Sequence, residues 1–287
     1  MSDQAESLRQ QLIIAENPKQ AKTLSIVSGK GGVGKSNTAL NFSIELIKKR
    51  KKVLLFDLDV GMGNIDILCG LHAKKTIIDM FTEHLSIYDI IEPGPAGLSY
   101  IAGGSGLSGF FMMDQEKQQY FFEQYKALVQ MYDYIIFDMG AGVTRDSLFF
   151  ILASDECIVI TTPEPTSITD AYGMIKHVIH NQPNMPIYVI MNRSFNHKDG
   201  LDSLERFKQV VTKFLRINIQ LLGILPDDPT VSKAVRRQMP YVMFSEKAAV
   251  SIALRQLTLN YLNETSNGNE IKSFSFIQKL KQLLTEK

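Results

Sequence analysis

Residues 29–36 read Gly29-Lys30-Gly31-Gly32-Val33-Gly34-Lys35-Ser36 and fit the pattern G-x-x-x-x-G-K-[ST]. A strand-like stretch, residues 23–28, precedes this loop and a helix-like stretch to about residue 50 follows it, which is the context that a phosphate-binding loop requires. Glycines allow successive backbone N–H groups to approach phosphates, and the helix N-terminus adds positive potential. In such a loop Lys35 neutralises phosphate oxygens and the Ser36 hydroxyl ligates Mg²⁺. We therefore predict that this loop, with Asn37, binds a nucleoside triphosphate.

The same glycines also satisfy a second pattern. Gly29, Gly31 and Gly34 match the dinucleotide fingerprint G-x-G-x-x-G, and Asp57 stands where such a site has a ribose-binding acid. The pair Lys35-Ser36 favours the phosphate loop, because a dinucleotide site requires close helix packing here rather than a cation and a hydroxyl. A glycine-rich turn without any ligand is the remaining alternative.

Strand-like and helix-like segments alternate along the rest of the chain. The expected strands after the first are residues 53–57, 98–102, 134–138, 156–161, 187–191 and 220–225. Helix-period stretches separate most of them, among them residues 114–131, 167–181 and 201–215. Short apolar strands alternating with helices predict a mostly parallel sheet covered by helices on both faces. With right-handed crossovers, this is a doubly wound α/β fold.

Length and composition set wider limits. The 287 residues, 45% hydrophobic and 21% charged, indicate a folded chain with room for a sizeable core. Because 31 Lys and Arg against 30 Asp and Glu leave a net charge of +1, binding to nucleic acid or membrane would have to be local. Two cysteines, Cys69 and Cys157, form no disulfide framework or metal motif, which favours a reducing, cytoplasmic setting. We expect a segment over residues 1–20, a nucleotide-binding domain over 21–263, and a hinge with an amphipathic helix over 264–287.

Two of the expected strands end in carboxylates. One leads into Asp57-Leu58-Asp59-Val60-Gly61-Met62-Gly63-Asn64, and the other into Asp138-Met139-Gly140-Ala141-Gly142. Carboxylates at the C-terminal ends of central strands face the ligand crevice of a doubly wound sheet. The second stretch is a Walker B pattern, which predicts that Asp138 supports Mg²⁺. Turn formation or helix capping is the alternative for Asp57 and Asp59.

The stretch Lys30-Gly31-Gly32-Val33-Gly34-Lys35-Ser36 resembles the deviant Walker A motif of the MinD/ParA (SIMIBI-class) P-loop ATPases. The resemblance implies slow, switch-type hydrolysis of ATP to ADP by a homodimer in which Lys30 contacts the partner's nucleotide. The pattern D-x-D-x-G-x-x-N is similar to switch I of MinD-like members, which implies that Asp59 orients the attacking water and Asp57 helps to hold Mg²⁺ through water. The predicted catalytic residues are thus Lys30, Lys35 and Asp59, and the predicted metal site is Ser36, Asp57 and Asp138.

Two later strand ends resemble the base-recognition segments of this family. Met191-Asn192-Arg193 matches an Asn-Arg pair that recognises adenine, which implies that Asn192 takes the base edge. Leu225-Pro226-Asp227-Asp228-Pro229 resembles the loop that closes over the base, and the guanine-specific N-K-x-D motif is absent from this place, which favours ATP over GTP. Residues 162–170 are also similar to MinD-type sequences, which implies that Glu164 and Asp170 contact the dimer interface or the nucleotide. A simple turn role is the alternative for Asn192.

The N-terminal residues match a more specialised pattern. D-Q-A-x-x-L-R-x-x-L, carried by Asp3, Gln4, Ala5, Leu8, Arg9 and Leu12, resembles the activator segment of FlhG-type flagellar ATPases. The resemblance implies that residues 3–12 stimulate the GTPase FlhF. The segment is too short to be stably helical alone, so folding into a partner's groove suits it. Packing on its own domain is the alternative.

The C-terminal stretch, residues 271–284, has a helical period and a broad apolar face. We predict that it binds an anionic membrane surface through Ile271, Phe274, Ile277, Lys279, Leu280 and Leu284, with Phe276 near the rim of the face. A single short helix is a weak anchor, so ATP-driven dimerisation would strengthen binding by doubling it. Docking of this helix on the protein core is the alternative.

Together, these resemblances imply a cytoplasmic, reversibly membrane-associated regulator of flagellar number and placement, which also contacts basal-body or C-ring components. Two alternatives share the same core: a DNA-partition ATPase of ParA type and a division-site ATPase of MinD type. The neutral net charge makes DNA an unlikely partner. The basic run at residues 48–52 and the pair Arg236-Arg237 keep the DNA alternative open.

Overall fold

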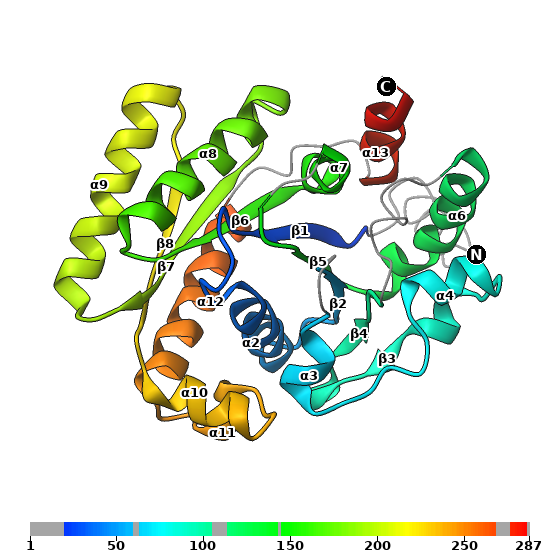
Figure 1. Ribbon diagram of the computed structural model, residues 1–287, viewed down its shortest axis with the longest axis horizontal. Helices are drawn as coiled ribbons and strands as arrows, with labels where there is room; N and C mark the ends of the chain where they lie inside the picture. Colours follow the sequence, from blue (N-terminus) through cyan, green and yellow to red (C-terminus); the bar gives the residue numbers. More distant parts are fainter. Residues whose placement is uncertain (1–19, 60–62, 105–113, 143–144, 268–275, 286–287) are drawn as a thin grey trace, which may run out of the picture.

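The computed structural model describes residues 20–59, 63–104, 114–142, 145–267 and 276–285 (Figure 1). Within these ranges one eight-stranded sheet has the order β3-β4-β2-β5-β1-β6-β7-β8. Its neighbouring strands run parallel, except that β3 is antiparallel to β4. The strands are β1 (Lys22–Val27), β2 (Val53–Leu58), β3 (Glu92–Pro93), β4 (Ser99–Ile101), β5 (Tyr134–Met139), β6 (Glu156–Thr161), β7 (Ile187–Ser194) and β8 (Gln220–Pro226).

Helices follow most strands and cover both faces of the sheet (Figure 1). On one side lie α4 (Ile77–Thr82), α6 (Gln115–Met131), α7 (Arg145–Ala153), α8 (Pro165–Asn181), α9 (His197–Leu215) and α13 (Phe276–Thr285). On the other lie α2 (Lys35–Lys48), α3 (Ile65–Cys69), α10 (Pro229–Arg236), α11 (Tyr241–Phe244) and α12 (Ala249–Asn267). Two short 3₁₀ turns, Ile87–Ile90 and Pro95–Gly97, flank β3. The predicted doubly wound α/β fold is confirmed.

Alternate side chains of the buried strands supply two separate cores. In β5, Ile135 and Phe137 pack under the α6–α9 side, whereas Tyr134 and Ile136 pack under α2 and α12. This period of two is what a strand covered on both faces requires. Parallel pairing then brings strand ends to one edge: in the register of the sheet, Asp138 of β5 lies beside Asp57 of β2 and Ile26 of β1. The predicted acidic strand ends therefore meet beside the glycine loop.

The last two helices differ from the expected hinge. Helix α12 continues through the expected boundary at residues 263–264 and ends at Asn267. Residues 268–275, which include Ile271 and Phe274, lie outside the described residues, as do residues 1–19 with the whole N-terminal pattern. Among the helices that the structure does describe, none combines the length and apolarity that crossing a bilayer requires.

Helix α13 packs its apolar face against the core. Phe276 is 3% exposed, and its ring stacks on Phe137 at 5.1 Å between centroids and lies 4.8 Å from Tyr125. Our placement of Phe276 near the rim of the apolar face is therefore wrong, because this side chain inserts into an aromatic cluster under the sheet. Ile277 and Leu280 are buried with it, and Leu284 is partly buried.

The polar side of α13 is also engaged. Lys279 Nζ lies 3.0 Å from Asp155 Oδ1, and Lys281 Nζ lies 5.0 Å from the centre of the Phe122 ring. In this conformation the predicted membrane residues Ile277, Lys279 and Leu280 contact the rest of the protein. Binding to a membrane would therefore require α13 to leave its place against the core.

Candidate nucleotide-binding site

The glycine loop joins β1 to α2 and wraps the start of that helix. Gly34 has φ +91°, a left-handed conformation that favours glycine, and a Cβ there would lie 2.4 Å from Asn192 Nδ2. A Cβ on Gly29 would lie 2.3 Å from the backbone of Asp170, so α8 approaches the loop too closely for any side chain. These two glycines are needed for the loop to lie between α8 and the end of β7.

Lys35 lies buried at the base of the loop. Its side chain is 6% exposed, and its Nζ donates to Asp138 Oδ1 at 2.5 Å and to Ser36 Oγ at 3.2 Å. Asp138 is fully buried, and within the described residues its second oxygen, Oδ2, has no hydrogen-bond partner. Burial raises the pKa of Asp138, whereas the neighbouring ammonium of Lys35 acts in the opposite direction. The structure thus brings together three residues of the predicted site: the phosphate-binding lysine Lys35, the metal ligand Ser36 and the Walker B aspartate Asp138.

Lys30 has a different environment at the rim of the loop. Its side chain is 35% exposed and donates to Glu164 Oε2 at 2.7 Å and to Thr166 Oγ1 at 3.1 Å. Lys30, followed by the nearby Arg193, lowers the pKa of the exposed Glu164 below its ordinary value of 4.5. Glu164 therefore carries a negative charge at neutral pH. Lys30 thus points to the surface, away from the Lys35–Asp138 pair.

Asp57 organises the chain that follows β2. Its Oδ1 accepts from the backbone N–H of Asp59, and its Oδ2 accepts from those of Asn64 and Ile65 at 2.7 and 3.0 Å. Burial, followed by the charge of Asp138, raises the pKa of Asp57 from 3.8 to about 7, although these N–H groups oppose the shift. The contacts place Asp57 in the capping role that was its alternative; a role in holding Mg²⁺ stays a prediction. Asp59 is partly exposed and directly precedes residues 60–62, which lie outside the described residues.

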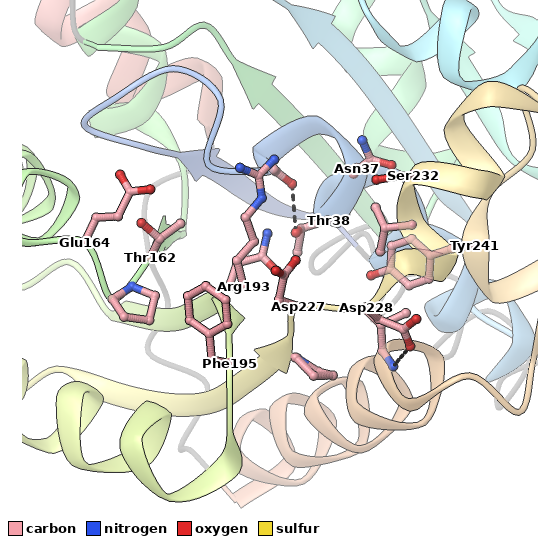
Figure 2. A pocket seen from close by; sticks show the side chains of 16 residues that line it. Asn37, Thr38, Thr162, Glu164, Arg193, Phe195, Asp227, Asp228, Ser232 and Tyr241 are labelled. Carbon is pink, nitrogen blue, oxygen red and sulfur yellow. Dashed lines mark hydrogen bonds between the residues drawn. The ribbon is translucent and has the colours of Figure 1, made fainter.

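A cleft of about 670 Å³ opens beside the loop, where β7 and β8 end (Figure 2). It contains every predicted base-recognition residue: Asn192, Arg193, Pro226 and Asp227, together with Asn37 of α2. Asn192 Nδ2 donates to the Val33 carbonyl at 2.8 Å, so this side chain braces the glycine loop and keeps its carbonyl oxygen for another partner. Arg193 has φ +55°, a left-handed backbone conformation that residues other than glycine adopt uncommonly.

Several residues that line the cleft were not identified from the sequence. Phe195 is 91% exposed at its mouth, and Tyr241 closes its inner end (Figure 2). Val231 and Val250 add apolar surface. Val231, Tyr241 and Val250 belong to three helices that only the fold brings to the cleft. Phe195 directly follows the end of β7, and no local pattern marks it. Among the other predicted residues, Glu164 lies at the rim of the cleft, and Asp170 packs against Gly29.

The fold and the loop define a nucleotide-binding protein, and the chain belongs to the CobQ/CobB/MinD/ParA nucleotide-binding domain family, whose model matches residues 24–241. This is a family of P-loop ATPases. The assignment agrees with the resemblance drawn from the glycine loop.

Curated relatives narrow the comparison. The flagellum site-determining protein YlxH of Helicobacter pylori is 33% identical over 252 residues, covering 83% of this chain and 83% of that protein. The antiactivator FleN of Pseudomonas aeruginosa is 27% identical over 234 residues, covering 82% and 84%. Among solved structures, MinD of Pyrococcus horikoshii in complex with Mg-ADP matches with a TM-score of 0.69 and 23% identity, covering 88% of this chain and all of that one.

Proposed function

We propose that this chain is an ATP-hydrolysing switch that regulates flagellar number and placement, and that its active form is an ATP-bound homodimer at the membrane. One observation carries the proposal: a phosphate loop with one buried and one exposed lysine occurs in a chain that is one-third identical to a flagellum site-determining protein. The wider family supports nucleotide binding, and this relative supports the flagellar role.

The phosphate chemistry rests on the buried part of the site. Lys35 would exchange its contact with Asp138 for the phosphate oxygens of ATP, and the loop N–H groups would bind the same phosphates. Mg²⁺, when bound, neutralises charge that develops on the phosphates. The unpartnered Oδ2 of Asp138 and the hydroxyl of Ser36 fit such an ion, because hard cations prefer oxygen ligands. Asp59 would hold the attacking water in line with the γ-phosphate.

Dimerisation would complete the site through Lys30. In the single chain this lysine is held by Glu164 and Thr166 at an exposed rim, so a partner can approach it. A cation that arrives from the partner stabilises developing charge only when two chains meet. Hydrolysis would then be coupled to dimerisation, which is the property a switch requires.

Two peripheral segments would connect this switch to its partners. Residues 3–12 would stimulate FlhF. The C-terminal helix would bind an anionic membrane after leaving the core surface against which α13 is packed. Its buried aromatic contacts mean that release has an energetic cost. Avidity from two helices in the dimer would help to offset this cost.

The proposal is tested with the purified full chain, FlhF and vesicles that contain anionic lipid. The chain should raise the GTPase rate of FlhF, and a variant that lacks residues 1–20 should not, while both bind ATP equally. ATP-dependent vesicle binding should be lost on deletion of residues 271–287. Salt-sensitive, ATP-dependent binding to nonspecific DNA without either effect would instead support the partition ATPase.

The catalytic step has its own test. Asp59→Ala should lower the hydrolysis rate by about 100-fold or more, as expected for the loss of a water-orienting group, and leave ATP affinity almost unchanged. Continued turnover at the wild-type rate would contradict the role of Asp59.

A further inference from the structure

The inner wall of the cleft carries a buried hydroxyl that the fold does not use. Tyr241, the first residue of α11, is 2% exposed and lines the same cleft as Asn192 and Asp227. Figure 2 shows its hydroxyl directed into the cleft. In the part of the chain that the structure describes, this hydroxyl has no hydrogen-bond partner. Since leaving a buried hydroxyl unpaired costs free energy, its presence here needs a reason.

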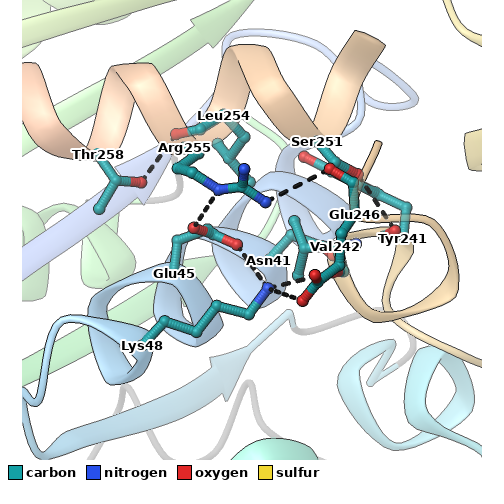
Figure 3. A network of polar contacts seen from close by, with 10 residues as sticks. All are labelled: Asn41, Glu45, Lys48, Tyr241, Val242, Glu246, Ser251, Leu254, Arg255 and Thr258. Carbon is teal, nitrogen blue, oxygen red and sulfur yellow. Dashed lines mark hydrogen bonds and ion pairs between the residues drawn. The ribbon is translucent and has the colours of Figure 1, made fainter. Parts of the chain in front are cut away.

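The main chain around Tyr241 is fixed by three hydrogen bonds from two helices, α2 and α12 (Figure 3). Ser251 of α12 donates to the carbonyl of Tyr241 at 3.2 Å, Asn41 of α2 accepts from the N–H of Val242 at 3.1 Å, and Lys48 donates to the Val242 carbonyl at 3.2 Å. This network ties α11 to the helix that starts at the glycine loop. It therefore holds the tyrosine ring at a set distance from the phosphate-binding residues.

Charged partners hold Lys48 in turn. Its Nζ contacts Glu45 at 2.9 Å and Glu246 at 3.3 Å, and Arg255 lies 3.7 Å from the other oxygen of Glu45. Glu45 is only 1% exposed, so its charge is balanced inside the protein rather than by water. A network this well satisfied contrasts with the single hydroxyl that is left unpaired beside it.

Two polar side chains of the cleft are already engaged, whereas the hydroxyl of Thr162, elsewhere in the cleft, also lacks a partner among the described residues. Thr38 donates to the Gly34 carbonyl at 2.9 Å, and Asp228 accepts from the N–H groups of Thr230 and Val250 at 2.8 and 3.2 Å. Burial raises the pKa of Tyr241 above its ordinary value, so the group stays a neutral hydroxyl that can donate or accept. Ligand sites combine apolar walls with a few placed polar groups of this kind.

We infer that the Tyr241 hydroxyl is a nucleotide-binding group, which makes a hydrogen bond to a polar atom of the nucleoside part of the bound nucleotide. The inference rests on the proposed nucleotide site and assigns its inner wall a role in binding affinity. The glycine loop holds the phosphate end of the ligand, and α11 the other end.

The test compares Tyr241→Phe with the wild-type chain in ATP binding and in thermal unfolding. The variant should bind ATP about 3- to 10-fold more weakly, as expected for one neutral hydrogen bond. Without nucleotide its melting temperature should stay equal or rise, because the unpaired hydroxyl is gone. A hydroxyl that has a structural role would instead lower the melting temperature of the nucleotide-free variant, and that result would overturn the inference.

Tyr125→Phe is the matched control. Tyr125 of α6 is also fully buried, and its hydroxyl likewise lacks a partner among the described residues, but it lies under α13 on the opposite face of the sheet. This variant should bind ATP as the wild-type chain does. Equal ATP affinity of Tyr241→Phe and the wild-type chain would overturn the inference alone. Failure of the wild-type chain to bind ATP would overturn the proposed function with it.

Ligand analogues then identify the atom involved. Purine riboside triphosphate, 7-deaza-ATP and 2′-deoxy-ATP each lack one polar atom of ATP. The analogue that lacks the partner atom should bind wild type and Tyr241→Phe equally, whereas the others keep the difference. Inorganic triphosphate should bind both proteins equally; a difference with this ligand would place the effect at the phosphates and contradict the inference.

Discussion

The two lysines of the glycine loop, five positions apart, have opposite surroundings. Lys35 is 6% exposed and paired with a carboxylate that is fully buried, whereas Lys30 is 35% exposed and paired with a carboxylate that is 63% exposed. Removing one partner of a buried pair leaves an uncompensated charge, while an exposed pair contributes little. The comparison indicates that the buried pair fixes Lys35 within its own chain, whereas the exposed pair lets Lys30 exchange Glu164 for another partner.

Replacement of Lys35 should have the largest effect. Lys35→Gln removes the cation that is proposed to bind the phosphates, so ATP affinity should fall by more than about 100-fold. It also leaves Asp138 buried without its partner, so the free energy of unfolding should fall by about 3–5 kcal/mol. Isothermal titration calorimetry and denaturant unfolding measure the two losses. Lys30→Gln is the matched control in the same loop, and it should lower neither quantity appreciably. Unchanged ATP affinity in Lys35→Gln would refute the phosphate assignment.

Replacement of Lys30 should act on the reaction alone. Lys30→Ala should lower the hydrolysis rate by about 1,000-fold, the scale of a cation supplied in trans to phosphoryl transfer, because no other group would replace that cation in the dimer. ATP affinity of the single chain should stay within about threefold, since the exposed side chain does not lie in the buried site. A coupled ADP-release assay and equilibrium binding separate these effects. Loss of binding equal to that of Lys35→Gln would abolish the distinction between the two lysines.

The smallest effect is expected at the carboxylate that holds Lys30. Glu164→Gln weakens an exposed contact, so ATP-dependent dimerisation should strengthen by no more than about threefold because Lys30 is released more easily. Analytical ultracentrifugation with a non-hydrolysable ATP analogue measures the change. Glu83→Gln is the control, because Glu83 also pairs with an exposed lysine, Lys75, at 2.6 Å. Dimerisation at least tenfold weaker in Glu164→Gln alone would show that this carboxylate itself helps to hold the dimer.

The sequence was sufficient to predict the central sheet and the edge of that sheet at which the glycine loop and the acidic strand ends lie. Local patterns specify both: apolar strands of fixed length, a glycine loop that only certain backbone angles allow, and acidic residues at strand ends. Register then places Asp57 beside Asp138 without further information. The segments between residues 60 and 98 were not predicted, because α3, α4 and β3 are too short to show a period.

Tertiary contacts decided what the sequence left open. The apolar face of α13 has the same sequence pattern whether it contacts a bilayer or a protein core. Only the stacking of Phe276 on Phe137 in the folded chain shows that this face is buried. Neither Tyr241 nor Phe195 belongs to a recognised motif, so neither was assigned to the cleft. Tyr241 lies in α11, which reaches the cleft only in the folded chain, and Phe195 directly follows the end of β7. Asn192 was expected to contact the adenine base, and the structure adds its hydrogen bond to the Val33 carbonyl of the glycine loop.

The central claim, that Lys30 acts on the nucleotide of the partner, is tested most directly by mixing two inactive variants. In a dimer of one Lys30→Ala chain and one Asp59→Ala chain, a single site has an intact Asp59 of its own and an intact Lys30 from the partner. ATP hydrolysis by an equal mixture should therefore recover to about one-quarter of the wild-type rate, because half of the dimers are mixed and each has one complete site. A mixture that stays as inactive as its components, while light scattering shows that mixed dimers form, would contradict the account.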